Sequence, residues 1–111
     1  MKINKYEIWL ANLNPSKGVE PGKTRPVVVI QSDLLNGLHP STIVCPITSN
    51  VVKEAEILRV YINKEQLEKE SDVLVDQMRA IDNKKLLKRL GKLNKEQLFK
   101  LKRNIGIVLD L

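Results

Sequence analysis

The stretch Lys23-Thr24-Arg25-Pro26-Val27-Val28-Val29-Ile30 passes from a charged, turn-rich segment into a continuous run of β-branched residues. Such a run is typical of a strand that is buried on both faces. Pro26 fixes its own φ angle and favours an extended backbone at the residue before it. Arg25 is therefore held at the mouth of a rigid strand, where a guanidinium is suited to binding an anion such as a phosphate. The commoner role of a loop arginine is that of a solvated charge, and this octapeptide alone leaves both roles open.

Apolar runs on either side of this stretch predict further strands, which we expect over residues 6–13, 42–48, 57–62 and 72–82. In the last of these, alternation places on one face Val73, Val75, Gln77 and Arg79. Because two of these side chains are polar, that face is expected to leave the core and reach a groove. Residues 84–93 are ambiguous between a helix and a last strand at 89–93.

The pentapeptide Asn-Lys-Glu-Gln-Leu occurs twice, beginning at Asn63 and at Asn94. Each copy predicts a helix start, with Asn as the N-cap and Gln three residues later closing a capping box. After Asn63 there is room for only a turn or two. After Asn94 a helix can run to the C-terminus, with one apolar stripe formed by Leu98, Leu101, Ile105 and Val108. Five or six short strands followed by a helix indicate a small, strongly bent sheet or barrel.

The composition is that of one soluble globular domain of 111 residues, with 42% hydrophobic and 29% charged residues. Only 4% of residues are aromatic, so the core is expected to be aliphatic. No apolar run approaches membrane-spanning length and the N-terminus lacks the apolar segment of a signal peptide, which predicts a cytoplasmic protein with no membrane partner. With one cysteine and one histidine there is no disulfide and no zinc site, so function without metal or cofactor is expected.

Three residues carry both a structural and a functional interpretation. Cys45 lies in a strand-like run, where a buried thiol is more common than a nucleophile. His39 precedes a proline and is expected in a loop, although an exposed imidazole near a phosphate could assist proton transfer. Trp9 is expected to fill the core or an interface, with stacking on a base as the alternative.

The formal net charge of +6 and the pI of about 9.6 favour a polyanionic partner. Residues 83–111 hold nine Lys and Arg residues against Glu96 and Asp110, whereas residues 1–82 carry a net charge of minus one. The general basic field therefore belongs to the C-terminal part. The Arg25 region is positive only locally, through Lys17 and Lys23.

Several short motifs stand in one order along the chain: Asn14-Pro15, Gly18, Glu20, Thr24-Arg25-Pro26, Pro46-Ile47-Thr48 and Asp76-Gln77-Met78-Arg79. In this order they resemble the MazF/PemK toxin family, and the resemblance runs from about Tyr6 to the C-terminal helix. It implies a mainly β fold over residues 1–111, a small SH3-like barrel with a C-terminal helix. It also implies a homodimer that acts as a metal-independent, sequence-specific ribonuclease and is neutralised by an acidic antitoxin. The family's catalytic arginine and threonine match Arg25 and Thr48.

Cleavage of RNA without a metal can use the 2′-hydroxyl of the substrate as the nucleophile, giving a 2′,3′-cyclic phosphate and a 5′-hydroxyl. Arg25 is suited to stabilising the phosphorane and protonating the leaving oxygen, and Thr48 to donating a hydrogen bond to a phosphate oxygen. The base stays open, because arginine remains protonated in proteins. Glu20 and specific-base catalysis are the alternatives, although Glu20 is also suited to fixing its loop by accepting from Lys23 or Arg25.

The residues expected to bind substrate flank this pair: Lys17, Glu20, Lys23, Thr24, Ser49, Gln77 and Arg79. Gln77 and Arg79 are expected to contact single-stranded RNA, with a buried hydrogen-bond network that braces Arg25 as the alternative. We expect apolar surface left over by the helix stripe and the sheet to be covered by a second copy of the chain. A non-catalytic nucleic-acid-binding module and a gyrase-directed toxin on a similar fold remain as other function classes.

Overall fold

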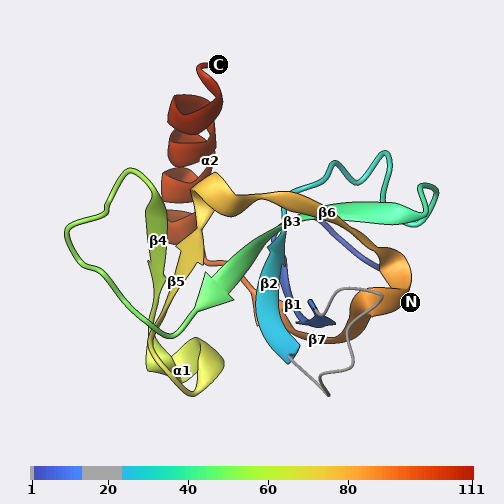
Figure 1. The fold of residues 1–111 in the computed structure, drawn as a ribbon, viewed down its shortest axis with the longest axis horizontal. Coiled ribbons are helices and arrows are strands. Elements are labelled where there is room, and N and C mark those ends of the chain that lie inside the picture. The colour runs from blue at the N-terminus through green and yellow to red at the C-terminus, as the bar shows by residue number, and fades with distance from the viewer. Residues whose placement is uncertain (1, 14–23) are drawn as a thin grey trace.

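The computed structural model describes residues 2–13 and 24–111, and its elements follow one another as Figure 1 shows. Seven strands, two α-helices and two single-turn 3₁₀ helices make up this part of the chain. In order they are β1 Glu7–Asn12, β2 Thr24–Val29, β3 Ser41–Thr48, β4 Arg59–Ile62, α1 Lys64–Leu67, β5 Ser71–Leu74, η1 Val75–Gln77, β6 Arg79–Asp82, η2 Asn83–Lys85, β7 Leu86–Lys92 and α2 Lys95–Leu109. No helix within the described ranges is long and apolar enough to cross a membrane.

The strands form one antiparallel, strongly bent sheet in the order β4-β5-β3-β2-β1-β7, with β6 paired to β3 outside this path (Figure 1). Strand β3 is the longest, with eight residues, and it organises the sheet. One edge pairs with β2, while the other pairs with β6 over its first half and with β5 at Ile47 and Thr48. The β-rich, barrel-like class expected from the sequence is confirmed, although the end strands β4 and β7 do not pair with each other in the described part of the sheet.

The core lies on both faces of β2. Val28 joins an apolar cluster with Ile8, Cys45 and Val73, whereas Val27 and Val29 join a second cluster with Trp9 and Leu86 on the other face. All three valines are fully buried. The prediction of a strand that is buried on both faces is therefore confirmed.

For Cys45 and Trp9 the sequence left a structural and a functional role open, and the structure supports the structural role of each. Cys45 is fully buried, and desolvation, with a contribution from Asp76, raises the pKa of its thiol to about 12. A thiol in this state is not a nucleophile at neutral pH. The Trp9 ring is 3% exposed, and its indole N–H donates to Oε1 of Glu7 at 3.1 Å, so no face of it is available to a base.

Helix α2 covers the first cluster with the predicted stripe. Leu101 is fully buried, and Leu98, Ile105 and Val108 pack against the same cluster from the edge. The stripe therefore belongs to the core, and it is not the apolar surface that the sequence led us to expect to be left over.

The expectation of one strand over residues 72–82 is wrong. Between the pairs Val44–Arg79 and Ile47–Val73, β3 has two residues and the opposite segment has five. The excess is taken up by η1, whose first residue, Val75, donates its backbone N–H to the carbonyl of Leu58 at 2.9 Å. This 3₁₀ turn ends the alternation of faces, so Gln77 and Arg79 do not share a face with Val73.

Two further segment predictions are settled. The fourth strand begins at Arg59 rather than at Ile57, because Leu58 is held in a turn by its backbone hydrogen bond to Ala55 at 3.2 Å. The ambiguous segment 84–93 contains β7, which pairs with β1.

The repeated pentapeptide starts both α-helices, as predicted, but only the second copy closes a capping box on itself. The side-chain amide of Gln66 instead pairs with that of Gln97, the equivalent residue of the second copy. Gln66 Nε2 donates to Gln97 Oε1 at 3.0 Å, and Gln97 Nε2 donates to Gln66 Oε1 at 2.7 Å. The two copies thus fasten α1 to the beginning of α2.

Candidate active site at the ends of β2 and β3

Arg25 and Thr48 lie at the same end of the sheet. The β2–β3 ladder ends at the pair Val27–Pro46, and Arg25 and Thr48 each stand two residues beyond that pair on their own strands. Because the strands are antiparallel, the beginning of β2 and the end of β3 meet at one edge. Arg25 is exposed there and Thr48 is half-buried.

A cavity of 380 Å³ opens at this edge. Two of its walls come from the strand ends, namely Thr24, Arg25 and Pro26 of β2 and Ile47 and Ser49 at the end of β3. The cavity therefore brings together three of the residues expected at the site, Thr24, Arg25 and Ser49. Thr48, the last residue of β3, is not among the described residues that line the cavity.

The third wall was not foreseen from the sequence. It consists of Leu67, Lys69 and Ser71, from the end of α1 and the beginning of β5. The pairing of Thr48 with Asp72 in the β3–β5 ladder brings this segment to the site. No local pattern around Lys69 indicates that pairing, and because Glu68 and Glu70 flank the lysine, the sequence shows no excess of positive charge at this point.

The Thr48 hydroxyl is oriented by the turn that follows it. Its Oγ1 accepts a hydrogen bond from the backbone N–H of Asn50 at 3.1 Å. A hydroxyl has one proton to donate and two lone pairs. With one lone pair used by the turn, the proton of Thr48 is left to be donated elsewhere.

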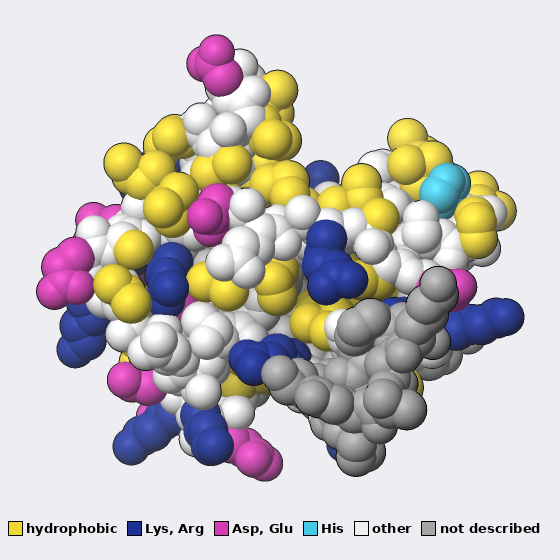
Figure 2. Space-filling view, viewed as in Figure 1, with side chains coloured by type: hydrophobic (Ala, Val, Ile, Leu, Met, Phe, Trp, Pro, Cys, Tyr) yellow, Lys and Arg dark blue, Asp and Glu magenta, His cyan; other side chains and the backbone are white. Residues whose placement is uncertain are grey.

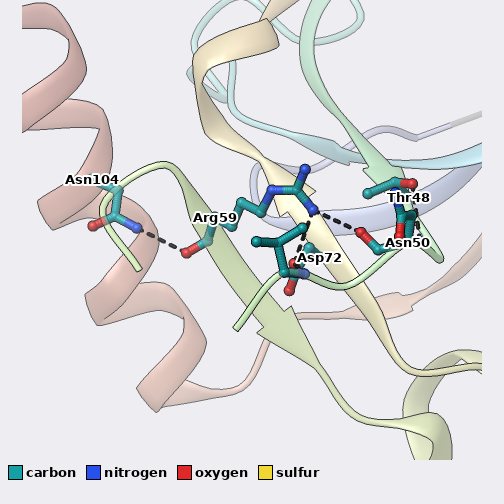
Figure 3. Close-up of polar contacts among 6 residues, drawn as sticks. Thr48, Asn50, Arg59, Asp72 and Asn104 are labelled. Carbon is teal, nitrogen blue, oxygen red and sulfur yellow. Dashed lines mark hydrogen bonds and ion pairs between the residues drawn. The ribbon is translucent and has the colours of Figure 1, made fainter. Parts of the chain in front are cut away.

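A partly buried ion pair holds that turn in place (Figure 3). Arg59 Nη1 donates to the carbonyl of Asn50 at 2.7 Å and contacts Oδ2 of Asp72 at 3.2 Å, and the same Oδ2 accepts from the backbone N–H of Val52 at 2.9 Å. Asp72 is only 3% exposed. We call the Arg59–Asp72 pair with these backbone contacts the turn clamp.

Helix α2 supports the turn clamp from behind. Asn104 is fully buried, and its Nδ2 donates to the carbonyl of Arg59 at 3.1 Å (Figure 3). The same Nδ2 donates to the carbonyl of Glu56 at 2.9 Å. Arg59 therefore connects the turn after β3 to the C-terminal helix, through its side chain on one side and its carbonyl on the other.

Among the described residues, no neighbouring group neutralises the positive charge at the site. Within residues 2–13 and 24–111, the side chains of Arg25 and Lys69 make no hydrogen bond or ion pair, and no carboxylate lines the cavity. In the middle of the face shown in Figure 2, Lys and Arg side chains stand clear of Asp and Glu. This edge of the sheet is therefore suited to an anionic ligand.

Other expected site residues lie elsewhere. Gln77 and Arg79 are exposed at the junction of η1 and β6 and do not line the cavity, so the alternative of a buried network bracing Arg25 is wrong. Lys17, Glu20 and Lys23 lie outside the described residues.

His39 is a loop residue, as expected, and is remote from the candidate site. Its Nδ1 lies 3.1 Å from Oγ of Ser41, the first residue of β3, whereas Thr48 is the last. Eight extended residues span roughly 23 Å. The alternative of proton transfer by His39 therefore has no support. Among the described residues no three His, Cys, Asp or Glu side chains gather as a metal site would require.

Comparison with known proteins now gives the family. Residues 4–109 match the family described as "PemK-like, MazF-like toxin of type II toxin-antitoxin system". A relative named Endoribonuclease MazF, from Staphylococcus epidermidis, is 35% identical over 111 residues, which covers 98% of this chain and 92% of the relative.

Solved structures agree in fold. The Mycobacterium tuberculosis toxin MazF-mt6 superposes with a TM-score of 0.78 at 26% identity, covering 95% of this chain and 97% of that one. A MazE–MazF structure from Deinococcus radiodurans gives a TM-score of 0.84 at 21% identity over 100% of this chain and 98% of that one. With 106 of its residues matched by the family model, the chain belongs to the PemK-like, MazF-like toxins of type II toxin–antitoxin systems.

Proposed function

We propose that this protein is a toxin that cleaves single-stranded RNA at specific sequences and so inhibits growth. The observation that carries the proposal is Arg25, a cation without a side-chain partner in the described structure, at the mouth of a cavity beside the strand end that bears Thr48. Family membership and the name of the Staphylococcus epidermidis relative support endoribonuclease activity.

The chemistry we propose needs no metal. The 2′-hydroxyl of the nucleotide before the scissile bond attacks the adjacent phosphorus, the bond to the 5′-oxygen breaks, and the products are a 2′,3′-cyclic phosphate and a 5′-hydroxyl. Arg25 stabilises the growing charge of the phosphorane and supplies a proton to the leaving oxygen, and its guanidinium at once regains a proton from water. The Thr48 hydroxyl donates a hydrogen bond to a non-bridging oxygen. Glu20, or hydroxide in specific-base catalysis, removes the proton of the 2′-hydroxyl.

Incubation of the purified protein with a long RNA in excess chelator tests this proposal. We expect fragments whose 5′ ends carry a hydroxyl, and sequencing those ends gives the cleavage motif. A non-catalytic module would bind the RNA and release no fragments. A gyrase-directed toxin would leave the RNA intact and inhibit supercoiling.

An acidic antitoxin is the partner we propose. The solved neighbours include MazE–MazF structures from Deinococcus radiodurans and a mycobacterial endoribonuclease in complex with its cognate antitoxin. Here the nine cations of residues 83–111 attract an acidic, disordered segment over a distance, and that segment folds over Arg25 and Thr48 and excludes RNA. This attraction weakens as salt rises.

We also propose that the toxin is a homodimer. Exposed apolar side chains gather along the upper edge in Figure 2, on the end of α2 and on the loop between β2 and β3. Leu38 in this loop is 85% exposed, and Ile107 and Leu109 on α2 are each 50% exposed. A second copy of the chain, related by a two-fold axis, would cover both groups.

A further inference from the structure

The third wall of the cavity, formed by Leu67, Lys69 and Ser71, has no role in the function proposed above. It shares with Arg25 a cavity of 380 Å³, which falls in the range of roughly 300–1,000 Å³ that small-ligand sites occupy. The cavity has three kinds of lining group: two cations, three hydroxyls and an apolar floor of Pro26, Ile47 and Leu67.

These three kinds of group match the three parts of a nucleotide. A cation binds the phosphate, a serine or threonine hydroxyl binds the ribose or a base edge, and an apolar surface packs against the base. One cation, Arg25, is already assigned to the scissile phosphate. The second cation, Lys69, is therefore left for a neighbouring phosphate of the same strand.

The backbone of Lys69 is held in place from both sides. Before it, Glu68 ends α1 with a left-handed backbone, φ 69°, which is uncommon for a residue other than glycine. After it, Ser71 Oγ donates to the carbonyl of Lys69 at 3.0 Å. Helix α1 is itself fastened to α2 by the paired amides of Gln66 and Gln97. The backbone from which the Lys69 side chain reaches the cavity is therefore fixed in place.

The ammonium group of Lys69 is also available for an external anion. The adjacent carboxylate of Glu70 accepts the hydroxyl proton of Tyr61 at 3.0 Å. Lys69 forms no ion pair with any residue in the described part of the chain.

From these observations we infer that the cavity holds one nucleotide of the RNA next to the cleaved bond, with Lys69 binding the phosphate of that nucleotide. This inference rests on the proposed function, because it places the RNA strand across Arg25. Lys69 takes no part in the chemistry, so it contributes to substrate affinity, whereas Arg25 contributes to the rate of the chemical step.

The test compares Lys69→Gln with Lys64→Gln, a variant that removes the same charge from an exposed position of α1 outside the cavity. The substrate is a short RNA that contains the cleavage site mapped with the wild-type protein. We expect Lys69→Gln to raise KM about fivefold to tenfold and to change kcat less than about twofold. Affinity for an uncleavable analogue with a 2′-deoxy group at the cut nucleotide should fall by the same factor. The slope of the logarithm of this binding constant against the logarithm of the salt concentration should become less negative by about 0.7. Lys64→Gln should behave as wild type in all three measurements.

A set of substrates, each with one neutral methylphosphonate linkage, identifies the phosphate. One linkage beside the scissile bond should weaken binding to the wild type as much as Lys69→Gln does, and should have no further effect on that variant. The inference is overturned if RNA is cut but Lys69→Gln behaves like Lys64→Gln, or if no linkage is coupled to Lys69. A wild-type protein that cuts no RNA overturns the proposed function, and this inference with it.

Discussion

Arg25 and Thr48 can be changed with little effect on the core, because neither belongs to the two apolar clusters. We expect Arg25→Ala and Thr48→Ala each to lower the rate of RNA cleavage by about a hundred- to a thousand-fold, since each removes a positioned electrostatic or proton-donating group. Arg25→Lys should also be poor, because lysine lacks the planar fork of donors. Cleavage assays measure the rate, and circular dichroism on the same samples shows whether each variant is folded. An Arg25→Ala protein that is folded and still toxic to cells would contradict the mechanism.

Glu7 gives a prediction about stability. Burial opposes its ionisation, but hydrogen bonds from the Asn4 backbone, Trp9 and Arg89 outweigh burial, so the pKa of Glu7 lies below its ordinary value of 4.5. The stabilisation is therefore fully present above about pH 4.5 and is lost as the pH falls through the lowered pKa of the folded state.

We expect Glu7→Gln to reduce the free energy of unfolding at pH 7 by about 1–2 kcal/mol. The difference from wild type should shrink below pH 4.5, the ordinary value for this carboxyl. Urea unfolding at several pH values measures it, with Glu65→Gln, an exposed residue of α1, as the control. A difference that stays constant down to pH 3 would contradict this account of Glu7.

At the scale of elements, the turn clamp is expected to matter for both stability and cleavage. Asp72→Asn removes the charge that pairs with Arg59 and leaves Arg59 partly buried, so we expect it to destabilise the fold by about 1–3 kcal/mol. Because the clamp also holds the carbonyl of Asn50 next to Thr48, kcat should fall about tenfold even where the variant is fully folded.

Single-turnover cleavage, at a temperature where denaturant unfolding shows more than 95% folded protein, separates the two effects. Glu54→Gln, an exposed carboxylate in the same loop, should change neither quantity. A folded Asp72→Asn protein with the wild-type kcat would limit the clamp to a structural role.

Sequence periodicity predicts those elements whose burial is set by their own residues. The valine run of β2 and the apolar stripe of α2 are of this kind, and both were confirmed. The break at η1 was not predicted, because it arises from the difference in length between β3 and the segment opposite it. Lys69 was missed for the same reason, since its place beside Arg25 depends on the pairing of Thr48 with Asp72.

At the scale of the whole molecule, the apolar edge formed by the β2–β3 loop and the end of α2 predicts self-association. Light scattering at micromolar concentration should give the mass of a dimer. Leu38→Glu and Ile107→Glu, at positions 85% and 50% exposed, should give monomers with unchanged circular dichroism. Ile57→Ser, which changes a residue 54% exposed in the β3–β4 loop, should remain dimeric. A wild-type protein that is a stable monomer and cuts RNA at full rate would contradict a dimeric toxin.

Asn104 also bears on the order in which the site is completed during synthesis. The two carbonyls to which it donates belong to residues 48 and 45 positions earlier in the chain. A chain growing from the ribosome therefore presents Arg25 and Thr48 well before the side chain that supports the turn behind Thr48 has been translated. For the ribonuclease proposed above, the messenger that encodes the toxin meets an unfinished site while it is being read, and the finished site exists only once α2 has docked.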